Sequence, residues 1–282
     1  MHESQPSRTA YRVAVRRAAH QVVDQPPVFV DPLALRILRR EDADRIQTDR
    51  AWADGHRFDR ALRAFLAVRS RFAEDELAAA VARGVPQFVL LGAGLDTFAY
   101  RNPFADLRVF EVDHPATQTW KRERLAEGAI AIPSNVTFVS VDFESQTVSR
   151  ELEAAGFDAS APAFFSWLGV TTYLTRESIR STLRFVVTAT SEAGGIVFDY
   201  ATDPAALPLV ARLTFDAMSR RVNAAGEPWQ TFLEPFDLAN ELRTLGFTEI
   251  RDLGPEAINA TYFAGRSDGL RVGSLGHVIL AR

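Results

Sequence analysis

The sequence predicts one α/β domain, with a mostly parallel sheet, an antiparallel edge and an N-terminal helical cap. Three observations predict this class. Short apolar runs alternate with helix-like stretches between residues 87 and 200, which is typical of a parallel sheet covered on both faces. Before residue 84 the pattern is helical, and after residue 246 two further apolar runs follow one another. These last two runs predict a hairpin-like edge.

Residues 1–84 are expected to form the helical cap, and residues 85–282 one compact core. The first cap helix repeats apolar side chains at helical spacing and keeps arginines off that face: Val15, Ala18, Ala19 and Val22 against Arg8, Arg12 and Arg16. A second helix is expected over residues 59–83, because Gly84 and Pro86 form a stop signal. We expect the cap to cover a ligand crevice at the carboxyl ends of the strands.

The core elements follow from the same alternation. The expected parallel strands are QFVLL (87–91), RVFEVD (108–113), NVTFVSVD (135–142), APAFFSW (161–167) and GGIVFDY (194–200). The expected helices between them cover residues 116–127, 147–155 and 176–192. A helix over 237–246 ends at a glycine and leads to the two edge runs, FTEIRDL (247–253) and HVILA (277–281).

Composition excludes several classes of protein and site. The 282 residues carry a formal net charge of −4, and this mild acidity argues against a dedicated nucleic-acid binder. Cysteine is absent, so disulfides, thiolate metal sites and a cysteine nucleophile are excluded. The five histidines have no metal-ligand spacing, and we expect no metal. The arginine-rich N-terminus lacks an apolar stretch long enough for a signal peptide or membrane span. Although a transit peptide is an alternative, we expect a cytoplasmic protein.

The strongest local signal is GAGLD, from Gly92 to Asp96, directly after the run QFVLL. Glycines such as Gly92 and Gly94 let a turn pass close to a ligand because they have no Cβ. The acidic pair Glu111 and Asp113 ends the next strand, about 20 residues on. That spacing places a carboxylate where it accepts hydrogen bonds from both ribose hydroxyls of an adenosine. We assign this role to Asp113 and keep Glu111 as the alternative.

The acids and the turn also indicate which nucleotide is bound. A pyrophosphate-binding turn uses a third glycine for close helix packing, whereas position 97 is Thr97. A further acid, Asp142, follows the third strand and precedes Phe143. The carboxylate can accept from an adenine amino group, and the phenyl ring can pack on the purine. These features favour S-adenosylmethionine over NAD, although Asp142 is also a residue type that caps helices.

The chain resembles the leucine carboxyl methyltransferase-like family of class I S-adenosylmethionine-dependent methyltransferases. Four segments carry the resemblance: QFVLLGAGLDTFAYR, VFEVDHPATQTWKRERL, FVSVDF and SWLGVTTYLT. It extends to the opening SRTAYRVAVRRAAHQVVDQPPVFVDPLA and the closing NATYFAGRSDGLRV, and is nearest to the bacterial branch with its O-methyltransferases of secondary metabolism. The resemblance implies a Rossmann-like methyltransferase sheet, S-adenosylmethionine as cofactor and a small-molecule methyl acceptor. It does not name the substrate.

The resemblance also implies roles at matching positions. Gly92 and Gly94 would lie beside the methionine part, Asp113 would hold the ribose, and Asp142 and Phe143 would hold the adenine. Arg71, in VRSRF, would pair with the cofactor's carboxylate, for which a planar guanidinium is well suited. A solvated helix face shared with Arg69 is the alternative for Arg71. Arg17 is a second candidate for the same environment.

One departure from the family bears on the acceptor. Eukaryotic members carry a glutamate in the segment SWLGVTTYL, where this chain has Leu168, so neither that cofactor contact nor a protein C-terminus as substrate is carried over. Trp167 and Tyr173 are suited to an aromatic or lipid-like small molecule, unless Trp167 only ends a buried strand. Tyr262 and Arg266 belong to a stretch able to hold a flat anion, with an ordinary surface turn as the alternative.

The expected mechanism is an in-line displacement in which the protein supplies alignment and electrostatics. A carboxylate acceptor needs no general base, whereas an alcohol or phenol does, most often histidine. His20 and His114 are the histidines expected near the crevice. Because His114 precedes Pro115, it is expected to cap a helix. No catalytic residue is therefore assigned, which favours a carboxylate or an acidic phenol.

Two other classes of function stay open. An NAD-dependent oxidoreductase would use a similar sheet, but Thr97 argues against it. So does the lack of a Tyr-x3-Lys pair, since Lys121 is the sole lysine. A non-catalytic nucleotide-binding protein would keep the fold without the chemistry, and Leu168 leaves this class open.

Overall fold

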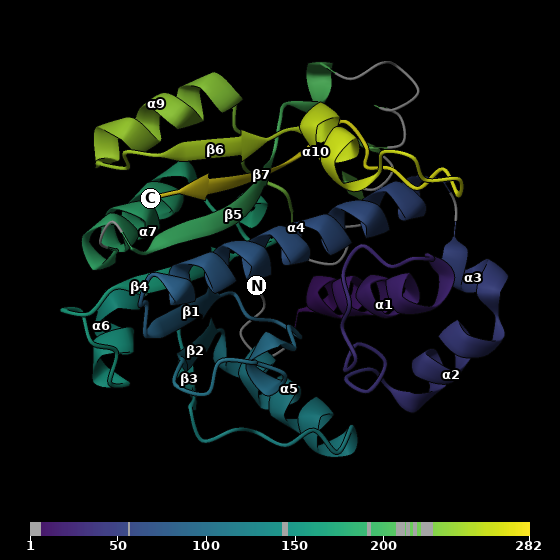
Figure 1. The fold of residues 1–282 in the computed structure, drawn as a ribbon, viewed down its shortest axis with the longest axis horizontal. Coiled ribbons are helices and arrows are strands. Elements are labelled where there is room, and N and C mark those ends of the chain that lie inside the picture. The colour runs from purple at the N-terminus through teal and green to yellow at the C-terminus, as the bar shows by residue number, and fades with distance from the viewer. Residues whose placement is uncertain are drawn as a thin grey trace.

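A central sheet with helices on both faces forms the body of the molecule (Figure 1). The computed structural model describes residues 7–55, 57–142, 146–190, 193–206, 212, 215–216, 219–220 and 228–282. The strands are β1 (Gln87–Leu91), β2 (Arg108–Asp113), β3 (Val136–Ser140), β4 (Ala163–Trp167), β5 (Gly195–Ala201), β6 (Ile250–Leu253) and β7 (Gly276–Ala281). Their order is β3-β2-β1-β4-β5-β7-β6.

The pairing confirms the predicted mostly parallel sheet with an antiparallel edge. Neighbouring strands from β3 to β5 run parallel, whereas β7 runs antiparallel to both β5 and β6. Strands β1 and β4 are buried along their whole length, as expected for central strands covered on both faces. The predicted edge runs therefore pair with each other, and β7 joins them to the parallel part.

The helices are α1 (Arg8–Val23), α2 (Arg40–Thr48), α3 (Arg50–Asp54), α4 (Arg57–Ala82), α5 (Pro115–Glu127), α6 (Val148–Ala154), α7 (Arg176–Ala189), α9 (Pro235–Leu245) and α10 (Pro255–Tyr262). Local signals set their ends. The Ser7 side chain accepts from the Ala10 N–H at the start of α1. His114 caps α5, as expected, and Pro115 follows it in the first turn. Gly246 ends α9 with a left-handed φ of 113°.

The N-terminal helices lie along one side of the sheet. Helices α1, α2 and α3 pack on one another, and α1 also packs on α4. Helix α4 crosses the sheet face over β4, β5 and β7 (Figure 1). It is therefore covered on two sides, and Ala64, Val68 and Phe72 are fully buried. The expected boundary near residue 84 stays a prediction about folding units, since α4 contacts both parts.

Candidate functional site

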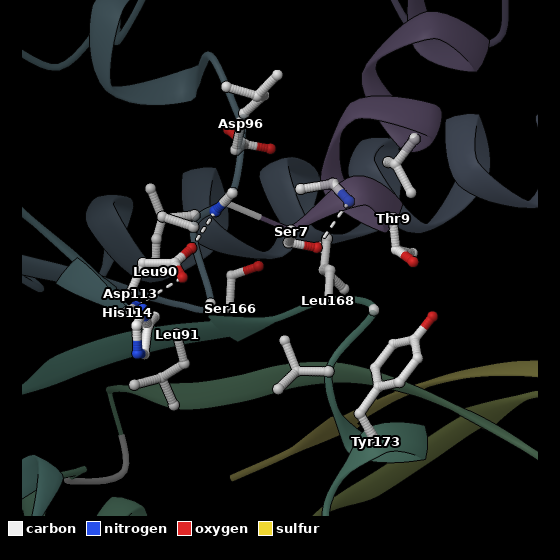
Figure 2. Close-up of a pocket in the computed structure, with 18 of the residues that line it drawn as sticks. Ser7, Thr9, Leu90, Leu91, Asp96, Asp113, His114, Ser166, Leu168 and Tyr173 are labelled. Carbon is white, nitrogen blue, oxygen red and sulfur yellow. Dashed lines mark hydrogen bonds between the residues drawn. The ribbon is translucent and has the colours of Figure 1, made fainter. Parts of the chain in front are cut away.

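A cavity of about 370 Å³ lies at the carboxyl ends of β1, β2 and β4 and is covered by α1. The loops after these strands form its floor, and residues from Ser7 to Arg17 of the first helix form the opposite wall. Figure 2 shows Ser7 and Thr9 on this helix facing Leu168 and Tyr173. The first helix thus covers the crevice at the carboxyl ends of the strands.

The glycine turn after β1 is part of this floor. Gly92 and Gly94 have left-handed φ angles of 67° and 45°. A Cβ on Gly92 would lie 2.4 Å from Cγ2 of Val170, so no larger residue fits without displacement of the β4 loop. The N–H groups of Gly92 and Ala93 both donate to the Val112 carbonyl oxygen. The turn is therefore held against β2 while it passes under the cavity.

Asp113 ends β2 and faces the cavity. Its carboxylate accepts from the backbone N–H groups of Gly94 at 2.5 Å and His114 at 2.7 Å (Figure 2). Burial raises the pKa of Asp113, and the two backbone hydrogen bonds offset this effect only partly. Glu111, the alternative acid, does not line the cavity, because its buried carboxylate accepts from Lys121 and Tyr100, both at 2.7 Å.

Asp142 also lines the cavity, beyond the end of β3. Its N–H donates to the Gln146 side chain and its carbonyl accepts from the Gln146 N–H. The cap position of α6 is Thr147, so Asp142 is not the cap residue of that helix. Phe143, expected beside the adenine, lies outside the described residues.

The structure separates the two arginines of VRSRF. Arg71 lies outside the cavity, because its half-exposed side chain pairs with Asp75 at 2.7 Å, one turn along α4. Arg69 lines the cavity and donates to Asp199 at 2.7 Å. The other Asp199 oxygen accepts from the Gly169 N–H at 2.5 Å. A Cβ on Gly169 would lie 2.9 Å from Nη2 of Arg69, so this glycine allows the guanidinium to reach the loop.

Arg17 is the second cation of the cavity, and it is buried rather than solvated. It donates to Asp31 at 2.7 Å and to Asp96 at 2.9 Å, and its Nε has no partner among the described residues. Burial alone would lower the pKa of Arg17, but the nearby carboxylates, Asp96 foremost, raise it. Burial alone would raise the pKa of Asp96, but the combined attraction of Arg17, Arg101 and Lys121, with a hydrogen bond from the Phe98 N–H, lowers it. The pair of Arg17 and Asp96 joins α1 to the loop after β1.

The four residues expected around the acceptor separate in the same way. Tyr173 lines the cavity, as does Leu168. Trp167 does not line the cavity and is fully buried in the core. Successive side chains of a strand point to opposite faces, and its neighbours Ser166 and Leu168 line the cavity. Tyr262 packs against the core from α10. Arg266 pairs with Asp268 and donates to the Pro26 carbonyl oxygen. Neither Tyr262 nor Arg266 lines the cavity.

The described lining contains one histidine, and it serves as a cap. His114 Nδ1 accepts from the Ala116 N–H at 3.3 Å, on the Asp113 side of the cavity. His20 is buried away from the cavity, where Nδ1 contacts Asp24 and Nε2 accepts from the N–H groups of Val28 and Phe29. The wall from Leu168 to Leu174 carries neither a carboxylate nor an imidazole.

Two kinds of feature, a metal-binding cluster and a membrane-spanning helix, are absent from the part of the chain that the structure describes. No group of three or more acids and histidines is placed to hold a metal ion. No described helix combines the length and the apolar character needed to span a membrane.

Several proteins of known sequence or structure resemble the chain. YktD of Bacillus subtilis (strain 168), named as an S-adenosyl-L-methionine-dependent methyltransferase, is 30% identical, and the alignment covers 100% of this chain and 99% of YktD. A Mycobacterium sp. (strain KMS) protein with the same kind of name is 30% identical over 91% of this chain and 80% of its own length. A structure from Thermobifida fusca YX, described as a methyltransferase, has a TM-score of 0.56 at 19% identity and covers 99% of this chain and 95% of its own.

The family model of leucine carboxyl methyltransferase matches residues 10–187. That range includes most of α1, Arg69, the glycine turn, the cavity acids at the ends of β2 and β3, and the wall after β4. The YktD match extends the similarity to both ends of the chain. The chain therefore belongs to the leucine carboxyl methyltransferase family of S-adenosylmethionine-dependent methyltransferases.

Proposed function

We propose that this enzyme is an O-methyltransferase whose acceptor is a small, largely apolar molecule of secondary metabolism that presents a carboxylate or an acidic phenol. The observation that carries the proposal is the division of the cavity into two sides. One side offers the acids and cations that suit the cofactor, and the other is a mostly apolar wall whose described residues include no base.

The residues present fit S-adenosylmethionine. Among the described lining residues are two arginines and three aspartates, with a formal charge of −1, complementary to a cofactor with a sulfonium, an ammonium and one carboxylate. Asp113 would accept from the ribose hydroxyls, since the Gly94 and His114 N–H groups hold its carboxylate in place. Hydrogen bonds to charged groups contribute about 1.5–3 kcal/mol each. Asp142 would accept from the adenine, and the Phe143 contact stays a prediction.

Arg69, rather than Arg71, would bind the cofactor's carboxylate. Arg69 has a single acidic partner, Asp199, whereas Arg17 already binds Asp31 and Asp96. A guanidinium with unused N–H groups can take a second carboxylate in a bidentate way. Gly92 would let the methionine part approach the turn, because a Cβ at this position would collide with the β4 loop.

The acceptor side favours a group that is already ionised. When bound, the cofactor supplies an electrophilic methyl group on sulfur. Leu168, Val170 and Leu174 would orient an apolar acceptor and exclude water, with Tyr173 on the same wall. Because no base stands on this wall and His114 Nδ1 is engaged as a cap, the acceptor must arrive as a nucleophile. Carboxylates meet this condition at neutral pH.

A matched panel of acceptors tests the proposal. The protein is incubated with S-adenosylmethionine labelled on the methyl group and with aryl and alkyl carboxylates, and with the alcohols and phenols of the same shape. We expect label in a base-labile ester of at least one carboxylate, label in the more acidic phenols, and none in the alcohols. Transfer to alcohols, or to nitrogen acceptors alone, would overturn the proposed acceptor class while leaving the cofactor assignment intact.

A further inference from the structure

A second cavity, of about 300 Å³, lies on the outer face of α1. We call it the outer groove, and it is lined by Ser7, Arg8, Tyr11, Arg12, Arg39 and Trp120. These residues come from α1, from the segment just before α2 and from α5. Apart from Ser7, which lines both cavities, none of them faces the methyl-transfer cavity.

The outer groove concentrates unneutralised positive charge. None of Arg8, Arg12 and Arg39 forms an ion pair with a described carboxylate, whereas the neighbouring Arg16 and Arg17 pair with Asp59 and Asp31. Three guanidinium groups without an acidic partner among the described residues thus line one small cavity of a chain whose net charge is −4. They repel one another, so they favour an anion that lies between them.

Aromatic rings form the floor of the outer groove. Tyr11 and Trp120 have ring centroids 5.8 Å apart, and the Arg39 guanidinium lies 5.5 Å from the Tyr11 ring. The Tyr11 hydroxyl donates to Asp42, an acid that does not line the groove. Burial and this hydrogen bond raise the pKa of Tyr11 to about 12, so the ring stays neutral. The groove thus joins cations to two aromatic rings.

We propose that the outer groove binds a small planar oxyanion, an aryl phosphate in chemical class, at a site separate from methyl transfer. Guanidinium groups bind phosphate oxygens bidentately, and aromatic floors stack planar groups. Arg8, Tyr11 and Arg12 share one face of α1, because residues three and four apart are neighbours on a helix. The positive end of the α1 dipole adds to the attraction. The volume of the groove suits a small molecule.

Phenyl phosphate is the probe for this site. It is titrated calorimetrically into the full chain with S-adenosylhomocysteine at saturation, so that the main cavity does not compete. We expect one saturable site that weakens with added salt, binds inorganic phosphate at least tenfold more weakly and does not bind benzyl alcohol. Equal affinity for phosphate and phenyl phosphate would overturn the planar part of the proposal. The absence of saturable binding, or binding of acidic peptides alone, would overturn all of it.

Single variants locate the site. Arg12→Gln and Trp120→Leu should each weaken phenyl phosphate about tenfold, whereas Trp120→Phe, which keeps a ring, should bind within about threefold of the unmodified chain. The control is Arg40→Gln, which removes the same charge from an exposed position in α2 that does not line the groove. If Arg40→Gln weakens binding as much as Arg12→Gln, the effect is overall charge and the proposed site is refuted.

Discussion

Arg69 and Asp199 form a buried ion pair of 2.7 Å that joins α4 to β5 beside the methyl-transfer cavity. The second oxygen of Asp199 is held by the Gly169 N–H, so the carboxylate and the guanidinium are both fixed in orientation. An arginine with one buried acidic partner is oriented without being saturated. This arrangement leads us to assign the cofactor's carboxylate to Arg69.

The first prediction compares the two neighbouring arginines of α4. Arg69→Ala should weaken binding of S-adenosylhomocysteine about tenfold or more, because it removes a charge-assisted contact worth about 1.5–3 kcal/mol. Arg71→Ala should leave affinity within about twofold, since Arg71 pairs with Asp75 outside the cavity. Isothermal titration calorimetry measures both. The assignment fails if Arg71→Ala causes the larger loss.

The sequence pattern cannot predict which of these two arginines points into the cavity. A helix with one buried face reveals that face by its period, but α4 is covered by the sheet on one side and by α1 on the other. Ala64 and Leu66 are both fully buried, although two residues apart on a helix point to nearly opposite sides. Period alone therefore cannot tell whether Arg69 or Arg71 points inward. The signal that could have distinguished them is Asp199, an acid inside a buried strand that needs a cation.

Burial and periodicity also decide which other elements and cavity residues could be predicted from the sequence. The strands were predictable because central strands are continuous apolar runs. Gly92 and Asp113 were predictable as cavity residues because Gly92 directly follows one such run and Asp113 ends the next. Helices α2 and α3 are short and polar, and α10 has only one buried residue, so they gave no periodic signal. Arg17 was the second candidate for the cofactor's carboxylate, and only the tertiary contacts with Asp31 and Asp96 explain its burial.

A second prediction concerns the glycine turn. Gly92→Ala and Gly84→Ala both place a side chain at a left-handed φ, so each should cost about 1 kcal/mol of stability from the backbone. Only Gly92→Ala also brings a Cβ to 2.4 Å from Val170, whereas nothing lies near a Cβ on Gly84. We therefore expect weaker S-adenosylhomocysteine binding for Gly92→Ala alone, measured by ligand-induced thermal shift. Equal ligand shifts in the two variants would exclude a role of the turn in binding.

A third prediction is that the N-terminal helical cap loses stability at acid pH. Asp24 is buried with His20 and Arg63; burial alone would raise its pKa, but their hydrogen bonds lower it to about 2 from 3.8. Because the pKa of Asp24 is lower in the folded chain than in the unfolded chain, its ionised form stabilises the fold at pH values above 3.8. This stabilisation is lost as the pH falls from 3.8 through about 2. The linkage is worth about 2 kcal/mol.

The variant Asp24→Asn isolates this contribution. Its deficit in free energy of unfolding against the unmodified chain should be largest near neutral pH, since Arg63 then loses its charged partner. The deficit should shrink by about 2 kcal/mol as the pH falls from about 5 to about 2. Urea unfolding at each pH measures it. A deficit that does not change with pH would show that Asp24 titrates normally in the folded chain.

A fourth prediction addresses the general base. For a carboxylate acceptor, kcat should be nearly constant from about pH 6 to about pH 9, because the nucleophile is ionised throughout. His114→Asn keeps a good capping residue and should retain activity within about threefold, whereas loss of a base would cost about 100-fold or more. Initial rates across pH decide this. A pH-dependent limb that disappears in His114→Asn would make His114 the base.

The central claim is that Asp113 holds the ribose of S-adenosylmethionine at the cavity formed by the glycine turn. The most direct measurement is a calorimetric titration of S-adenosylhomocysteine into the unmodified chain, Asp113→Ala and the exposed control Asp106→Ala, with NAD as comparison ligand. We predict one site for the unmodified chain and the control, an affinity at least about tenfold lower for Asp113→Ala, and no NAD binding. Unchanged affinity in Asp113→Ala, or binding of NAD in place of S-adenosylhomocysteine, would contradict the account.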